Sequence, residues 1–112
     1  MKKTMDVSRA YERASAVRAR ATYVLKLYVA GATPQSTRAL VNIKAICEEH
    51  LLGRYELEVV DVFLRPAQAR AEDIVAVPTL LKKLPAPLRR LVGDLSNKER
   101  VLVGLKIKPK QH

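Results

Sequence analysis

One strongly apolar segment constrains the fold of this chain more than any other feature. Residues 23–29 read Tyr-Val-Leu-Lys-Leu-Tyr-Val and are dense in β-branched, aliphatic and aromatic side chains. Leu25, Leu27 and Val29 share one face of a strand, and the other face is also largely apolar. Such a run is typical of a central strand that is covered on both faces. We therefore expect a sheet to be built outward from this strand.

The segment that follows predicts a helix and then a second strand. After a turn at Gly31, Thr33 can cap the helix and Pro34 suits its first position. The helix should end near Leu51, and alternating apolar residues predict a strand over 55–63. The buried stripe of the helix is expected to contain Leu40, Ile43, Cys47 and Leu51. Strand, crossover helix and strand at this spacing predict a right-handed βαβ unit with parallel strands.

The second half of the chain is more ambiguous. Residues 66–73 begin with proline and are rich in alanine, which favours a short helical turn. Residues 74–81 suit a strand that Pro78 interrupts. The prolines of residues 84–87 exclude a helix interior, because proline fixes φ and lacks an amide donor. Residues 88–92 fit an edge strand or a helical turn.

A last helix is predicted near the C-terminal end. Gly93, Asp94 and Leu95 turn the chain. The four residues 96–99, Ser-Asn-Lys-Glu, have the pattern of a capping box with Ser96 at the cap. The helix that follows should bury Val101, Leu102 and Leu105.

The resulting order, β-α-β-α-β-β-α, is thioredoxin-like, and Pro78 stands where that fold places a cis-proline. Thioredoxin chemistry needs a Cys-x-x-Cys motif at the first strand-to-helix turn, where a helix N-terminus lowers the thiol pKa. The turn here contains no cysteine, and Cys47 lies on the apolar stripe of the helix. Disulfide exchange is therefore not expected.

Other catalytic and metal-binding arrangements are missing as well. His50 and His112 are the only histidines, and with one cysteine they do not form a usual zinc site. The acidic pairs at 48–49 and 72–73 consist of adjacent residues, which point in different directions on a helix. Neither glycine-rich phosphate-binding fingerprint is present. We predict a binding module that is not an enzyme and uses no metal or cofactor.

Size and charge divide the chain into three parts. With 112 residues, of which 48% are apolar, it suits one domain with one core. Residues 1–22 form a basic N-terminal extension of net charge +4, residues 23–107 form the domain, and residues 108–112 form a basic tail. The extension carries a thin stripe of Val7, Ala10, Ala14, Val17 and Ala21. That stripe suits either a frayed, solvated segment or a helix that packs on a partner or a second copy.

The +10 charge and the single cysteine bear on compartment and partners. A positive charge gives weak, salt-sensitive attraction to any polyanion. Nucleic-acid modules also stack bases on aromatic side chains, and one Phe, four Tyr and no Trp are few for that purpose. We therefore expect no specific nucleic-acid binding. No apolar run approaches the length of a membrane span, and no secretory signal begins the chain. One cysteine makes no internal disulfide, which favours a reducing compartment. We expect a cytoplasmic protein without a membrane association.

Several contiguous stretches resemble the KaiB family over residues 23–107. The opening Leu-Tyr-Val-Ala-Gly and the later Gly-Asp-Leu-Ser form a specific combination. The stretches that carry the resemblance are Tyr23–Gly31, Thr33–Pro34, Arg38–Leu40, Val59–Val62, Val77–Leu80, Arg89–Arg90 and Gly93–Glu99.

This resemblance implies a metamorphic clock protein. KaiB-like proteins exchange between a resting β-α-β-β-α-α-β form, often tetrameric, and a monomeric thioredoxin-like form. The latter docks on the N-terminal ATPase ring of KaiC, captures KaiA and competes with a sensor kinase. The resemblance thus implies an adaptor of a KaiC-like ATPase in a circadian clock or a clock-derived stress or timing module. It also implies a homo-oligomer, dimer or tetramer, and a KaiA-like protein or sensor kinase as further partners.

The same resemblance suggests which residues matter. The candidate partner contacts are Arg38, Lys82, Arg89 and Arg90, with solubilising surface as the alternative interpretation. The candidate structural or switch positions are Gly31, Thr33, Pro34, Pro78, Gly93, Asp94, Ser96, Gly104 and Lys106.

Departures from the family pattern indicate a divergent homologue. Residues 85–87 read Pro-Ala-Pro where three prolines are common, and Glu58 stands where a basic residue is expected. Lys106 replaces the aspartate of the usual Gly-Leu-Asp ending. A thioredoxin-like sensory or scaffold protein that acts on a signalling kinase, or as a homo-oligomer without KaiC, is therefore the alternative.

Overall fold

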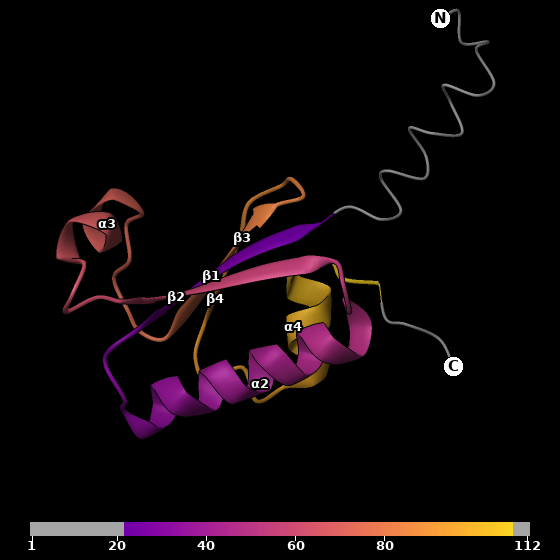
Figure 1. Ribbon diagram of the computed structural model, residues 1–112, viewed down its shortest axis with the longest axis horizontal. Helices are drawn as coiled ribbons and strands as arrows, with labels where there is room; N and C mark the ends of the chain where they lie inside the picture. The colour runs from indigo at the N-terminus through magenta and orange to yellow at the C-terminus, as the bar shows by residue number, and fades with distance from the viewer. Residues whose placement is uncertain (1–21, 109–112) are drawn as a thin grey trace, which may run out of the picture.

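The computed structural model describes residues 22–108, which form one four-stranded sheet with three helices (Figure 1). The elements in chain order are β1 (Tyr23–Val29), α2 (Pro34–His50), β2 (Tyr55–Asp61), α3 (Pro66–Ala71), β3 (Thr79–Leu84), β4 (Arg89–Val92) and α4 (Lys98–Gly104). This is the predicted β-α-β-α-β-β-α order, so the thioredoxin-like prediction is confirmed. The stripe predicted in residues 1–22 and the tail beyond residue 108 lie outside the described residues.

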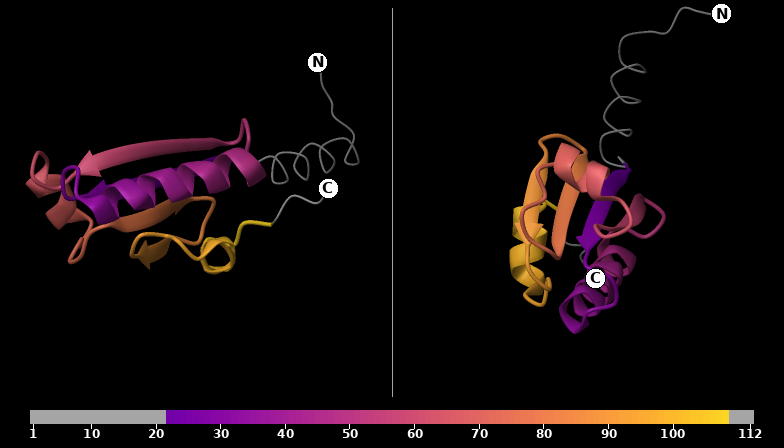
Figure 2. Two further views of the ribbon diagram at one scale, coloured as in Figure 1. Left: turned by 90° about the horizontal axis from the view of Figure 1, so that it is seen from below. Right: turned by 90° about the vertical axis from the view of Figure 1, so that its left-hand side faces the viewer.

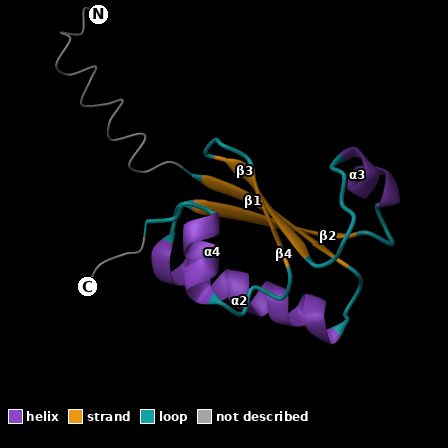
Figure 3. Cartoon of the chain, turned by 180° about the vertical axis from the view of Figure 1, so that it is seen from behind, coloured by secondary structure: helices purple, strands orange, loops and turns teal. Residues whose placement is uncertain are grey.

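The strand predicted to be central is central. The sheet has the order β2-β1-β3-β4, with β1 parallel to β2 and antiparallel to β3 (Figure 3). Leu25, Leu27 and Tyr28 of β1 are fully buried. Residues 88–92, for which the sequence allowed two structures, contain the edge strand β4.

The helices cover the two faces of the sheet unequally. Helices α2 and α4 lie on one face, and the short α3 lies on the other, as the end-on view in Figure 2 shows. The main core is on the α2 and α4 face and includes Leu25, Leu27, Ile43, Leu80 and Leu105. A smaller cluster under α3 contains Tyr28, Val60, Ala69 and Leu81. None of the helices among residues 22–108 combines the length and apolar content that crossing a bilayer requires.

Helix α2 begins as its sequence predicts. The Thr33 hydroxyl accepts a hydrogen bond from the Ser36 amide at 3.3 Å, and Pro34 occupies the first turn. Three of the four residues of the predicted stripe are fully buried, whereas Leu40 is half-buried at the edge of the core.

Two predicted strand boundaries were wrong. β2 ends at Asp61 and not at residue 63, because the Asp61 carboxylate accepts a hydrogen bond from the Phe63 amide at 2.9 Å and its carbonyl accepts from two further amides. β3 begins at Thr79, because residues 76–78 bend into a cis Val77–Pro78 peptide. The sequence pattern predicts a strand from residue 74, interrupted by Pro78.

The predicted capping box was also wrong. Asn97 caps α4, with its side-chain oxygen accepting from the Arg100 amide at 3.0 Å. The Ser96 amide instead donates to the Asp94 carboxylate at 3.1 Å, which holds Ser96 in the preceding turn. The cap therefore moves one residue toward the C-terminus.

The end of α4 is a Schellman motif. The Ile107 amide donates to the Leu102 carbonyl at 2.8 Å, and the Lys106 amide donates to the Val103 carbonyl at 3.1 Å. Lys106 has φ +56°, a region that a non-glycine residue occupies at a cost. Gly104 lies so close to β4 that a Cβ atom would come within 2.8 Å of Leu91 Cδ2.

The left-handed conformation of Lys106 generates a first prediction. Lys106→Gly should raise the free energy of unfolding by about 1 kcal/mol, because glycine adopts positive φ without a steric cost. Urea unfolding measures this change. Lys106→Ala is the matched control, since it removes the charge but keeps the strain, and it should recover much less. Equal gains from both variants would attribute the effect to charge.

A second prediction concerns the form that the free chain adopts. In the form seen here Lys106 follows the last helix, where cations interact favourably with the helix dipole. We expect the free protein to rest in this form and not in the other form that the family resemblance implies. Backbone NMR shifts of residues 95–105 should show a helix beginning after Ser96, and a strand over those residues would refute the prediction.

Candidate functional site

Seven of the predicted functional positions gather at one end of the sheet, where β1 and β2 end and β3 begins. We call this the loop end and define it as residues 30–34, 62–65, 73–78 and 93–97. The N-terminal end of α2 and the whole of α3 lie toward it in Figure 1. Gly31, Thr33, Pro34, Pro78, Gly93, Asp94 and Ser96 belong to it.

The inner part of the loop end is fixed by backbone contacts. Gly31 has φ +58°, which turns the chain from β1 toward α2. The Gly93 amide donates to the Pro78 carbonyl at 2.9 Å, and Gly93 has φ +122°. Pro78 is buried beneath these loops. The connection before β3 is therefore joined to the connection after β4.

A polar latch joins α2 to the loop after β4. Arg38 Nε lies 3.4 Å from Asp94 Oδ2, and the Asn42 side-chain amide donates to the Asp94 carbonyl at 2.9 Å. Hydrogen bonds from Ser96, and then the Arg38 guanidinium, hold the pKa of the Asp94 carboxyl below its usual range. The side chain of Arg38 stays 59% exposed. Arg38 can therefore hold the loop and still meet a partner.

Large apolar side chains are exposed on the same loops. Phe63 is 73% exposed, Leu64 is 79% exposed and Val75 is 93% exposed. Val92, at the adjoining end of β4, is about half exposed. Clustered exposed apolar residues mark sites of interaction with other proteins. We call these four residues the apolar rim.

The loop end offers little room for a small ligand. A half-open cavity of about 110 Å³ lies between β4 and α4 and is lined by residues that include Gly93, Asp94, Asn97 and Arg100. Ligand pockets usually measure roughly 300–1,000 Å³. Among residues 22–108, no group of three or more His, Cys, Asp or Glu side chains is placed to hold a metal ion. The geometry of this end favours a surface for docking over a pocket for a cofactor.

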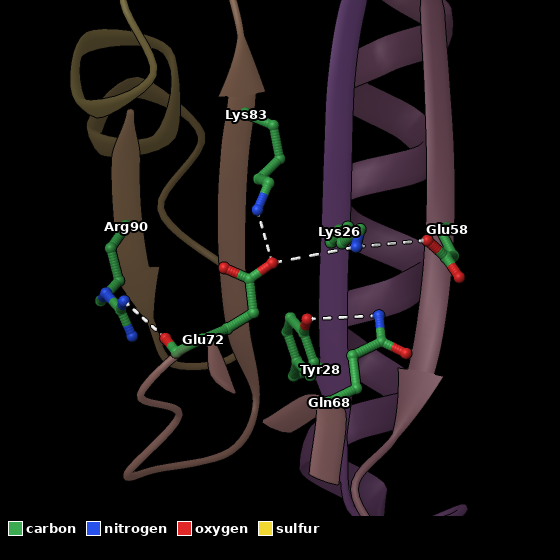
Figure 4. A network of polar contacts seen from close by, with 7 residues as sticks. All are labelled: Lys26, Tyr28, Glu58, Gln68, Glu72, Lys83 and Arg90. Carbon is green, nitrogen blue, oxygen red and sulfur yellow. Dashed lines mark hydrogen bonds and ion pairs between the residues drawn. The ribbon is translucent and has the colours of Figure 1, made fainter. Parts of the chain in front are cut away.

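Arg90 takes part in a separate network on the α3 face of the sheet (Figure 4). Its guanidinium donates to the backbone carbonyls of Glu72 at 2.9 Å and Asp73 at 3.0 Å. The Glu72 carboxylate pairs with Lys83 and with Lys26, and Lys83 holds the pKa of that carboxyl below its usual range. Arg90 is exposed but ties β4 to the segment that follows α3.

The other predicted contacts lie away from the loop end. Lys82 is only 1% exposed, because strand alternation points it toward the core face, so it is not placed to contact a partner in this form. Arg89, its neighbour on β4, is half-buried. Gly104 and Lys106 lie at the end of α4, near Tyr23, whose hydroxyl donates to the Lys106 carbonyl at 3.3 Å. Of the four predicted contacts, the structure brings only Arg38 to the loop end.

Sequence reasoning missed the apolar rim. The sequence pattern predicts a strand through Phe63, although the aspartate two residues before it and the proline three residues after it together signal a turn. The pattern also predicts a strand through Val75, although Pro78 follows three residues later. No sequence pattern indicates the role of Asn42, whose side-chain amide donates to the Asp94 carbonyl.

Cys47 has the properties of a core residue. It is fully buried in α2, and burial raises the pKa of its thiol to about 12. A thiol with such a pKa supplies almost no thiolate near neutral pH.

Solved thioredoxins share this fold. The chain matches the crystal structure of chloroplastic thioredoxin z with a TM-score of 0.61 and 17% identity, covering 86% of this chain and 88% of that one. It matches mitochondrial thioredoxin 3 from Saccharomyces cerevisiae with a TM-score of 0.62 and 14% identity, covering 87% and 88%. At this level of identity the likeness concerns the fold alone.

Sequence comparison gives a closer relationship. Residues 26–107 match the KaiB domain. The "Circadian clock oscillator protein KaiB" of Nostoc sp. is 56% identical over 88 residues, which cover 79% of this chain and 82% of the relative. The protein of the same name from Prochlorococcus marinus is 56% identical over 86 residues, covering 77% and 72%. This chain therefore belongs to the KaiB domain family.

Proposed function

We propose that this chain is a non-catalytic adaptor that docks on a KaiC-like ATPase through its loop end and regulates the timing or signalling output of that ATPase. The observation that carries the proposal is the apolar rim, which a KaiB-family chain exposes at the same end of the sheet where Arg38 pairs with Asp94. The relatives named as circadian clock proteins support the class of function.

The chemistry of the loop end suits a protein partner. Phe63, Leu64 and Val75 offer apolar area to be buried, and an exposed aromatic residue is a favoured anchor at interfaces. Arg38 provides a charge at the rim of this area, where charges steer association and select partners. An acidic face with an apolar centre is the matching surface on the ATPase.

The other three predicted contacts are weaker candidates for binding a partner than Arg38. Arg90 is exposed but already donates to two carbonyls, so it is the second candidate after Arg38. Arg89 is half-buried and ranks below it. Lys82 would reach a partner only in another conformation, such as the resting form that the family resemblance implies.

Further partners belong to the same proposal. A KaiA-like protein or a sensor kinase would bind the adaptor in a clock or timing module. When it is not docked, the adaptor would form a dimer or tetramer. We place these events in the cytoplasm, since the chain has a single, buried cysteine.

The docking proposal predicts that Arg38→Glu weakens binding to a purified KaiC-like ATPase about tenfold, because it puts an anion against an acidic face. Fluorescence anisotropy of the labelled adaptor measures the Kd. Phe63→Ala should weaken binding by a similar factor through lost apolar burial. Lys44→Glu is the matched control, since Lys44 is exposed on the same helix away from the loop end, and it should change the Kd less than about twofold.

A further variant separates docking from loop disruption. Asp94→Asn breaks the ion pair with Arg38 but keeps the arginine, so the Kd should stay near that of the parent chain. Equal losses in the Arg38 and Lys44 variants would contradict a localised docking surface and point to diffuse electrostatics. Unchanged binding in both the Arg38 and Phe63 variants would move the interface elsewhere.

The non-catalytic part of the proposal predicts no disulfide-reductase activity. The turn before α2 has no thiol, and Cys47 is buried with a pKa near 12. An insulin-reduction assay should give no turnover above buffer. Turnover that disappears in Cys47→Ser would refute this prediction.

A further inference from the structure

The end of the sheet opposite the loop end gathers positive charge around Tyr23. Lys82 Nζ and the Arg54 guanidinium carbon each lie 6.0 Å from the centroid of the Tyr23 ring. The Tyr23 hydroxyl donates to the carbonyl of Lys106, which brings the end of α4 to the same place. Arg89 faces Lys82 directly across the β3–β4 pairing.

Lys82 and Arg89 point to the core face of the sheet. Lys82 is two residues from Leu80 and Arg89 is two residues from Leu91, and both leucines belong to the core on that face. Residues 82–83 and 89–90 are basic pairs, so alternation sends one member of each pair to each face. Each face of the sheet therefore receives one lysine and one arginine from these pairs.

The two sets differ in their partners. On the α3 face, Lys83 pairs with the Glu72 carboxylate and Arg90 donates to two carbonyls (Figure 4). On the core face, no acidic side chain within residues 22–108 pairs with Lys82, Arg89 or Lys106. The Nε atom of Arg89 is buried without a hydrogen-bond partner in that part of the chain.

This arrangement is costly unless an anion balances it. Burial, together with the charges of Arg89 and Lys106, lowers the pKa of the Lys82 ammonium. An unpaired buried charge is strongly unfavourable, and a buried donor without a partner is uncommon in native proteins. Lys82 is buried, Arg89 is half-buried and Lys106 is exposed, so solvent reaches two of the three cations.

We propose that Lys82, Arg89 and Lys106 form an oxyanion site beside Tyr23 that takes a phosphate group. A phosphate carries more charge than a carboxylate and presents oxygens in several directions, which suits cations arriving from β3, β4 and the end of α4. The free Nε side of the Arg89 guanidinium offers a directional donor to such an oxygen. Because two cations already lie 6.0 Å from the centroid of the Tyr23 ring, the ring is not offered to a stacked base, and the site recognises the phosphate.

Binding at this site would join separate parts of the fold. β3 and β4 follow one another at the C-terminal half of the sheet, and Lys106 follows α4, which packs on that half. A phosphate held by all three residues would fasten the second half of the domain to β1 through Tyr23. Phosphate should therefore stabilise the thioredoxin-like form.

The test compares thermal unfolding of the full chain in sodium phosphate and in sodium chloride at equal pH and ionic strength. Phosphate should raise the Tm of the parent chain by about 5 °C. This increment should disappear in Lys82→Gln and in Arg89→Gln. It should persist in the matched controls Lys83→Gln and Arg90→Gln, which alter the neighbouring residue of each basic pair on the opposite face.

A titration followed by NMR gives a second readout and identifies the source of the phosphate. Inorganic phosphate should shift the backbone amides of Tyr23, Lys82 and Arg89, and ATP should shift the same amides while adenosine does not. An equal phosphate increment in Lys82→Gln and Lys83→Gln, or shifts spread evenly over all exposed lysines, would overturn the site. If Lys82→Gln does not fold, the pair of Arg89→Gln and Arg90→Gln decides the outcome.

Discussion

The fold depends on the central position of β1, which pairs with a neighbouring strand along both of its edges. Leu25 pairs with Leu57 of β2 on one side and with Lys82 of β3 on the other, while Leu27 pairs with Val59 and Leu80. Because β1 pairs with β2 along one edge and with β3 along the other, each neighbour has its register set by β1. Helix α2 then covers the strand with Ile43, which is fully buried. The positions of both ends of the sheet follow from this one strand.

The two ends have acquired different properties. At the loop end, Arg38 pairs with Asp94, and several large exposed side chains are apolar. At the Tyr23 end, the surplus is positive charge. Apolar surface favours contact with proteins, whereas concentrated charge favours ions and charged groups. One small domain thus offers two chemically distinct surfaces that can be tested by separate variants.

The first half of the domain could be predicted from sequence because each local signal agrees with the tertiary structure. Thr33 and Pro34 start α2, and the apolar sequence of β1 by itself indicates a buried strand. The start of α4 could not be predicted, since Ser96 and Asn97 are both good caps and the choice depends on Asp94, which binds the Ser96 amide. The apolar rim was missed because the ends of β2 and β3 depend on turns, and apolar residues just beyond a strand look like part of it.

The alternation of side chains along a strand decides the surroundings of neighbouring basic residues. Lys82 and Lys83 are adjacent and chemically identical, so residue type gives no reason to expect different roles. The strand places Lys83 beside Glu72, where its charge is balanced, and places Lys82 against Tyr23, where positive charge accumulates. The partner contacts predicted from sequence include Lys82 and not Lys83. Alternation along β3 puts Lys82 on the same face as Leu80, which pairs with Leu27 in the core, and this is why Lys82 is buried.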